Sequence, residues 1–340
     1  MENEIICRQD VHENERSAWG ALRTTATVIG ATLGALALAN AFIAARVGPL
    51  QSGLPGTFNR FPTRSGDAAY VVAGSGSPVL LLHGIGAGNS MLEWEKNFEA
   101  LREQHTVYAL DLLGWGRSDR PQGPYRPDDY VDLIQSFARN VIGEPCAIIA
   151  SSDSCSYAIE AAQQSPELFS QLVLVCPSIV PEKTEQSKSE SKAILWVFGL
   201  PIIGQMLHNI FASRRAVRSF AEHQLYFDKE RVSEALVTRY YNDAHQPGAR
   251  HGLASFASGS MRHDALPAWG RLRQPALLVW GRNTQINGVE TAPEWLALKA
   301  NAELHVIDNA LLLPHVEHAD EWNRLVLHWL RDAQSHTGTQ

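Results

Sequence analysis

From about residue 57 onward, short apolar runs alternate with stretches of helical pattern. Most of these runs are continuous, which is typical of strands that are buried on both faces of a parallel sheet. The expected strands cover residues 70–72, 79–83, 106–110, 146–150, 172–176, 276–280 and 303–307. This order predicts an α/β fold with a mostly parallel sheet and helices on both faces.

The alternation stops between residues 181 and 270, where polar and helical stretches replace it. We therefore expect a helical cap over 181–270, inserted into a core made of residues 57–180 and 271–335. Within the cap, glycine and proline interrupt the apolar segment 194–204 too often for a clean membrane span. This segment covers a pocket, touches a bilayer surface or packs in the core, and the sequence leaves these alternatives open.

The N-terminal part carries an uncharged run over residues 25–45, followed by Arg46. At 1.5 Å per residue, a helix of this length crosses roughly 30 Å of hydrocarbon. A cleaved signal peptide, with its cleavage site at 39–41, and a soluble amphipathic helix are the competing interpretations. The acidic segment that precedes the run is unlike the short basic start of a signal. We expect a polar tail over 1–24, an uncleaved membrane anchor over 25–46 and a linker over 47–56. Arginines flank the span on both sides, so its orientation stays open.

Composition narrows the classes of partner. Apolar residues make up 45% of the 340 residues and charged residues 19%, which is enough apolar material for a large core. The net charge of −7 and the lack of a basic run disfavour nucleic acid. The four cysteines lack metal or dithiol spacing and are interpreted as small buried side chains. His315 and His318 lack a third ligand and are interpreted as helix-surface histidines, so no metal or other cofactor is expected.

Three segments together resemble the α/β-hydrolase family, and the similarity covers about residues 56–332. The first is VLLLHGIG at 79–86, a strand followed by a His-Gly turn. The second is VYALDLLGWGRSD at 107–119, and the third is IIASSDSCSYA at 148–158. The resemblance implies an α/β-hydrolase fold with a nucleophile at a sharp turn in the third segment. It also implies an oxyanion hole from the N–H groups of Ile85 and Asp153, with His83, Gly84 and Ser151 beside the pocket.

The turn that holds the nucleophile needs small residues two positions before and two positions after it. With Ser152 as nucleophile these are Ala150 and Ser154, in place of the usual glycines. With Asp153 as nucleophile the chain would resemble a haloalkane dehalogenase. We prefer Ser152, while a turn that carries no nucleophile and only closes the core stays open.

Two of the three positions of the family's catalytic triad hold residues that cannot do its chemistry. The acid position, three residues after the glycine that ends the seventh strand, is Thr284. The histidine position, just before LPHVE at 313–317, is Leu312. A threonine carries no charge and a leucine accepts no proton, so ordinary serine hydrolysis is in doubt. His315 or the carboxylate of Asp153 are the candidate substitutes for the missing base.

Three functions follow from these residues. The first is a membrane-anchored hydrolase that cleaves an ester or similar bond of a hydrophobic small molecule through Ser152 with a non-standard base. The second is a catalytically inactive pseudo-hydrolase that binds a ligand or a protein partner. The third is a non-hydrolytic enzyme that uses the oxyanion hole alone. The sequence slightly favours the first, without deciding whether the chain is an enzyme.

Overall fold

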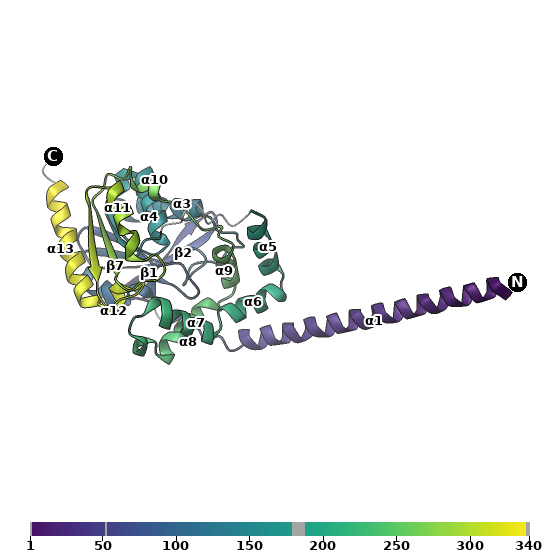
Figure 1. The fold of residues 1–340 in the computed structure, drawn as a ribbon. Helices are drawn as coiled ribbons and strands as arrows, with labels where there is room; N and C mark the ends of the chain where they lie inside the picture. The colour runs from purple at the N-terminus through teal and green to yellow at the C-terminus, as the bar shows by residue number, and fades with distance from the viewer. Residues whose placement is uncertain (1, 52, 179–187, 338–340) are drawn as a thin grey trace.

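The computed structural model describes residues 2–51, 53–178 and 188–337. Its centre is an eight-stranded sheet in the order β1-β2-β4-β3-β5-β6-β7-β8 (Figure 1). The β1–β2 and β2–β4 pairs are antiparallel and all other neighbours are parallel, which confirms the mostly parallel sheet. The strands are β1 (Thr57–Thr63), β2 (Gly66–Ala73), β3 (Pro78–Leu82), β4 (Thr106–Leu110), β5 (Cys146–Ser151), β6 (Phe169–Val175), β7 (Ala276–Gly281) and β8 (Ala302–Ile307).

The two edges of the sheet differ from the sequence prediction. Strand β1 was not predicted, because its apolar residues alternate with polar ones and it contains Pro62. Such a strand is tolerated only at an edge, where one backbone face needs no partner. At the other edge, β8 is largely exposed rather than buried on both faces, because no strand follows it. The central strands β3, β5 and β7 are completely buried, as expected.

Helices cover both faces of the sheet. On one face α2 (Glu95–Arg102) packs against the C-terminal helix α13 (Ala319–Thr337), with the short α12 (Pro314–Glu317) between them. On the other face lie α3 (Pro127–Phe137), α4 (Ser154–Gln164), α10 (Leu266–Trp269) and α11 (Ala292–Leu298). The largest side chains of the core are indoles and phenyl rings with no exposed surface, among them Trp94, Trp280 and Trp322.

The cap consists of helices that lie between β6 and β7 in the chain. They are α5 (Lys188–Gly199), α6 (Ile203–Phe211), α7 (Arg214–Phe220), α8 (Glu234–Ala244) and α9 (Ala249–Ala257). The expected helical insertion is thus present, and its first residues, 181–187, lie outside the described residues. Helices α5 and α6 meet at an angle of 103°. The break falls at Pro201, which removes a backbone donor where the first helix ends.

Helix α1 (Glu2–Ala44) projects from the globular part beside α6 (Figure 1). Its segment Leu22–Ala44 is long and apolar enough to cross a membrane. Residues 2–24, expected as a tail, continue the same helix. The end of α1 is fixed to the cap, because the Asn40 side chain donates to the Ile202 carbonyl at 3.0 Å and accepts from the Asn209 amide at 2.9 Å.

Candidate functional site

The turn between β5 and α4 places Ser152 in a strained backbone conformation. Ser152 has φ of 54°, whereas the following Asp153 is right-handed helical. A left-handed non-glycine residue at a sharp strand-to-helix turn is the conformation that a nucleophile elbow requires. Ala150 and Ser154 are completely buried on either side. Ser154 stands at the position where the family usually has a glycine. Its hydroxyl donates a hydrogen bond to the His83 carbonyl at 2.6 Å.

The two predicted oxyanion donors are free to bind an acceptor. In the described part of the chain, no hydrogen bond uses the backbone N–H of Ile85 or of Asp153. Ile85 follows Gly84, whose own N–H donates to Oε2 of Glu93 at 2.9 Å. Two unpaired N–H groups near a serine are the elements that stabilise a negatively charged oxygen.

His83 and Ser151 are buried, and neither belongs to the walls of the three clefts described below. The Nδ1 atom of His83 lies 2.7 Å from the Gly84 carbonyl, and its Nε2 accepts the Leu112 N–H at 3.1 Å. These partners require a neutral ring with the proton on Nδ1. The imidazole of His83 thus holds the His-Gly turn against the loop after β4. The position of His83, Gly84 and Ser151 beside a ligand pocket stays a prediction.

Thr284 and Leu312, the residues predicted at the acid and histidine positions, both contribute to the packing of the fold. The Thr284 hydroxyl donates to the Gly281 carbonyl at 2.8 Å and closes the turn after β7. Leu312 is part of the apolar core, and its N–H donates to the Gln224 carbonyl of the cap at 3.3 Å. Neither side chain offers a group that could take a proton from Ser152.

Glu317 fixes the loop that carries Leu312. Its Oε2 accepts the Leu311 N–H at 2.9 Å, and its Oε1 accepts the N–H groups of Phe227 and Asp228 at 2.8 and 3.2 Å. One carboxylate thus joins the loop after β8 to the cap. Bonds between a carboxylate and backbone N–H groups are charge-assisted and strong, so a large displacement of this loop toward Ser152 would be costly.

His315 lies in the core, so the expectation that it is a helix-surface histidine is wrong. It has no exposed surface, and its ring packs on Trp94 with centroids 4.4 Å apart. Its Nε2 lies 3.3 Å from Oε1 of Glu93, an electrostatic contact without hydrogen-bond geometry. Neither ring nitrogen forms a hydrogen bond with any described residue, and hence neither bonds to Ser152. The structure does not bring the two candidate catalytic residues together.

Glu93 is the residue of this region that sequence reasoning missed. Burial opposes its charge, but His315 and the Ser151 hydroxyl favour the charged form, and the pKa of Glu93 lies below its usual value. Its Oε2 accepts from Gly84 and from the Asn89 amide. In the sequence the residue is an acid near the start of a helical stretch, a pattern too common to signal a buried carboxylate.

Asp153 does not act on the Ser152 hydroxyl in this structure. Its Oδ1 accepts the Ser178 hydroxyl at 2.7 Å. Burial raises the pKa of Asp153, while Ser178 and the charge of Arg262 oppose that shift. The Ser152 hydroxyl itself forms no hydrogen bond with any described residue. Ser152 and Asp153 are thus neighbours in the chain, and no hydrogen bond among the described residues joins their side chains.

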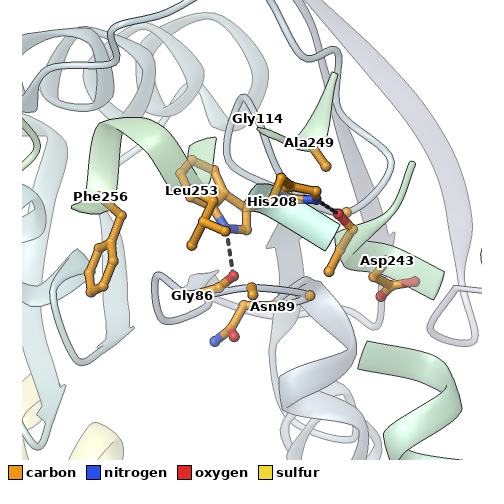
Figure 2. A pocket seen from close by; sticks show the side chains of 13 residues that line it. Gly86, Asn89, Gly114, His208, Asp243, Ala249, Leu253 and Phe256 are labelled. Carbon is orange, nitrogen blue, oxygen red and sulfur yellow. Dashed lines mark hydrogen bonds between the residues drawn. The ribbon is translucent and has the colours of Figure 1, made fainter. Parts of the chain in front are cut away.

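Among the clefts formed by the described residues, three lie where the core meets the cap or the linker, and Ser152 lines none of these three. A cleft of 240 Å³ runs between α2 and α8, with Glu93, Arg239 and Tyr226 among its walls. A narrow cleft separates α6 and α9 from the loop after β3, and Figure 2 shows Leu253 and His208 on the side of the cleft away from Gly86, with the His208 ring hydrogen-bonded within the cap. The Trp115 indole donates to the Gly86 carbonyl at 2.8 Å and closes one side.

Within residues 2–51, 53–178 and 188–337, no group of three or more histidine, cysteine or acidic side chains is placed to hold a metal ion. Cys146, Cys155 and Cys176 are free and buried, as expected. Burial raises the pKa of the Cys146 and Cys176 thiols to about 12, so they remain uncharged.

Comparisons with known proteins agree with the fold. The family described as "Alpha/beta hydrolase family" matches residues 79–325, more than half of the chain. The chain belongs to the α/β-hydrolase family. 2-Hydroxymuconate semialdehyde hydrolase of Pseudomonas sp. (strain CF600) is 26% identical over 285 residues, 77% of this chain and 90% of that enzyme.

Two further similarities involve proteins with lipid-related names. The 1-acylglycerol-3-phosphate O-acyltransferase ABHD5 of Rattus norvegicus is 28% identical over 158 residues, 43% of this chain and 44% of that protein. This relative and the mycobacterial relatives are matched over less than half of their own length. The crystal structure of a bacterial membrane phospholipase A superposes with a TM-score of 0.67 at 18% identity, over 94% of this chain and 99% of that one.

This α/β-hydrolase also has an acidic residue with a strongly shifted pKa where the cap meets the core. Burial and the nearby charge of Asp111 raise the pKa of Asp243 to about 7, against the opposing effects of Arg239 and Ser90. Asp243 lies on α8 and accepts from the Ser90 hydroxyl at 3.3 Å. Ionisation of Asp243 is therefore less favourable in the folded protein than in the unfolded chain.

Replacing Asp243 by asparagine should stabilise the protein in a pH-dependent manner. The folded state binds the proton more tightly than the unfolded state, whose pKa is near 3.8, so the parent loses stability as pH rises from about 4 to about 7. The Asp243→Asn variant does not lose stability in this way, because asparagine does not titrate. Its free energy of unfolding relative to the parent should rise by roughly 1–3 kcal/mol between pH 5 and pH 8, measured by urea unfolding.

The exposed carboxylate of Asp308 provides the matched control. Asp308→Asn should give the same difference from the parent at both pH values. An equal offset for Asp243→Asn at pH 5 and pH 8 would contradict the raised pKa.

Proposed function

We propose that this chain is a membrane-anchored pseudo-hydrolase, which binds a hydrophobic acyl compound at a preserved oxyanion hole and does not hydrolyse it at an enzymatic rate. The observation that carries the proposal is the Ser152 hydroxyl, which lacks a hydrogen-bond partner in the described part of the chain. A serine without a base is a poor nucleophile at neutral pH. The free N–H groups of Ile85 and Asp153 still suit the carbonyl or carboxylate of a ligand.

The class of ligand is inferred from the surroundings of the site. The narrow cleft near Gly86 has apolar walls from Leu253 and Phe256. The names of two similar proteins, an acyltransferase and a membrane phospholipase, concern acylated lipids. An ester or free acid of a lipid would combine an apolar body with the oxygen that an oxyanion hole binds.

Hydrolysis through Ser152 with Asp153 as the base is the second candidate. The observation that favours it is the strained backbone of Ser152, which costs on the order of 1–3 kcal/mol and is typical of functional sites. This candidate requires the Asp153 carboxylate to leave the Ser178 hydroxyl and reach the serine oxygen.

Membrane anchoring by α1 is supported by the contacts of Asn40. Its side chain bonds to Ile202 and Asn209, so this end of α1 is part of the folded protein. Cleavage of a signal peptide at 39–41 would remove these contacts and leave the Asn209 side chain without this acceptor. The apolar helix is therefore proposed as a retained anchor.

Restoring the two missing triad residues should create an esterase. In the variant Thr284→Asp/Leu312→His, an imidazole would stand at the family's base position with a carboxylate behind it. We expect hydrolysis of p-nitrophenyl butyrate to rise roughly 10-fold to 100-fold over the parent, because a positioned base contributes at least that much. The parent itself should equal Ser152→Ala in rate.

The matched control is the triple variant Thr284→Asp/Leu312→His/Ser152→Ala, which should have lost the gained activity. A parent rate well above that of Ser152→Ala would contradict the pseudo-hydrolase and favour the second candidate. Circular dichroism of each variant shows whether the buried substitutions preserve the fold.

The retained anchor predicts the mass of the mature chain. Protein extracted with detergent from the membranes of expressing cells should have the intact mass that includes residues 1–41, because Asn40 belongs to the fold. Mass spectrometry of the purified protein measures this directly. A mature chain that starts near residue 42 would show a cleaved signal peptide instead.

A further inference from the structure

Large apolar side chains of the cap are exposed to solvent on α5, α6 and α7. Trp196 is 68% exposed, Ile210 57% and Phe211 60%, and Ile203 and Phe220 are exposed as well. We call these five residues the cap apolar surface. Single exposed apolar residues are normal, but several on consecutive helices indicate an interaction site.

The cap apolar surface adjoins the end of the proposed anchor. Helix α6, which carries Ile203, Ile210 and Phe211, packs directly on α1. Asn40 bonds to the Ile202 carbonyl, one residue before α6 begins. Figure 1 shows α5 and α6 on the side of the globular part from which α1 emerges. The end of the anchor helix α1 therefore lies directly beside the cap apolar surface.

The position of Asn40 within the apolar segment fixes the depth of α6. The segment ends at Ala44, and Asn40 lies four residues before that end, which corresponds to about 6 Å along the helix. When Leu22–Ala44 spans a bilayer, the bond from Asn40 brings the start of α6 to the boundary between headgroups and acyl chains. Interfacial helices lie at this depth, about 5–10 Å into the membrane.

Basic side chains lie around the same region. The Arg46 guanidinium stacks over the Phe42 ring at 3.7 Å, where the apolar segment ends. Arg250 donates to the Pro201 carbonyl at 3.3 Å, at the break between α5 and α6. Lys192, Arg214 and Arg215 are exposed on α5 and α7. Apolar residues bordered by lysine and arginine are typical of segments that lie on anionic membranes.

We propose that the cap apolar surface inserts into the same leaflet in which α1 ends, so that the bilayer covers it. The proposal rests on the anchor of the proposed function and goes beyond it. This placement would give a membrane lipid a short route to the narrow cleft. His208 of α6 and Leu253 of α9 line the narrow cleft together with Gly86, so a lipid leaving the bilayer beside α6 would meet this cleft next to the residue that follows the proposed donor Ile85.

Spin labels on the full-length chain in liposomes of phosphatidylcholine and phosphatidylglycerol test this proposal. Cys7 is replaced by serine, and the three buried cysteines stay. One label at a time is attached through Trp196→Cys, Ile210→Cys or Phe211→Cys. Val28→Cys reports on α1, and Leu298→Cys, exposed on α11 away from α1 in Figure 1, is the aqueous control.

The ratio of collision rates with oxygen and with a water-soluble nickel chelate distinguishes lipid from water. At positions 196, 210 and 211 this ratio should exceed that of position 298 several-fold. If these positions resemble 298 while position 28 is lipid-exposed, the inference is overturned and the anchor stands. If position 28 also resembles 298, the anchor itself fails. Dipolar broadening at 210 and 211 would identify a second copy as the occupant, which also overturns the inference.

Discussion

The buried carboxylate of Glu93 organises the site. It accepts the Gly84 N–H of the His-Gly turn and the Asn89 amide, and it lies against the His315 imidazole. A buried charge must be compensated by such contacts, or its burial costs several kcal/mol. The same contact keeps His315 in the core, against Trp94, where it cannot serve Ser152. Glu93 thus stabilises the His-Gly turn and contacts His315 in the core, away from any bond to Ser152.

In the proposed pseudo-hydrolase the site keeps the backbone geometry of the elbow and lacks the proton relay. The left-handed turn at Ser152 and the unpaired N–H groups of Ile85 and Asp153 come from the sheet, the elbow and the loop after β3. These features persist when the side chains of the triad change. Thr284 and Leu312 instead contribute a turn hydrogen bond and core packing. Binding and transition-state charge stabilisation can survive without a base, whereas proton transfer cannot.

The sequence predicted the architecture well, because continuous apolar runs and the His-Gly and elbow motifs are local patterns. It located all strands except β1, whose alternating pattern and Pro62 reflect an edge position that only pairing with β2 reveals. His315 was interpreted as a surface residue, since its burial depends on Trp94 and Glu93, which are distant in the chain. The hydrogen bond between the Glu317 carboxylate and the Phe227 N–H of the cap is likewise a tertiary contact, which no local sequence pattern indicates.

The central claim is that nothing activates the Ser152 hydroxyl, and the rate of its modification by a fluorophosphonate measures activation most directly. The purified full-length protein in detergent should react no faster than Ser152→Ala, with no adduct on the peptide that contains residue 152 by mass spectrometry. Rapid adduct formation on Ser152 in the folded protein, lost on denaturation, would contradict the account.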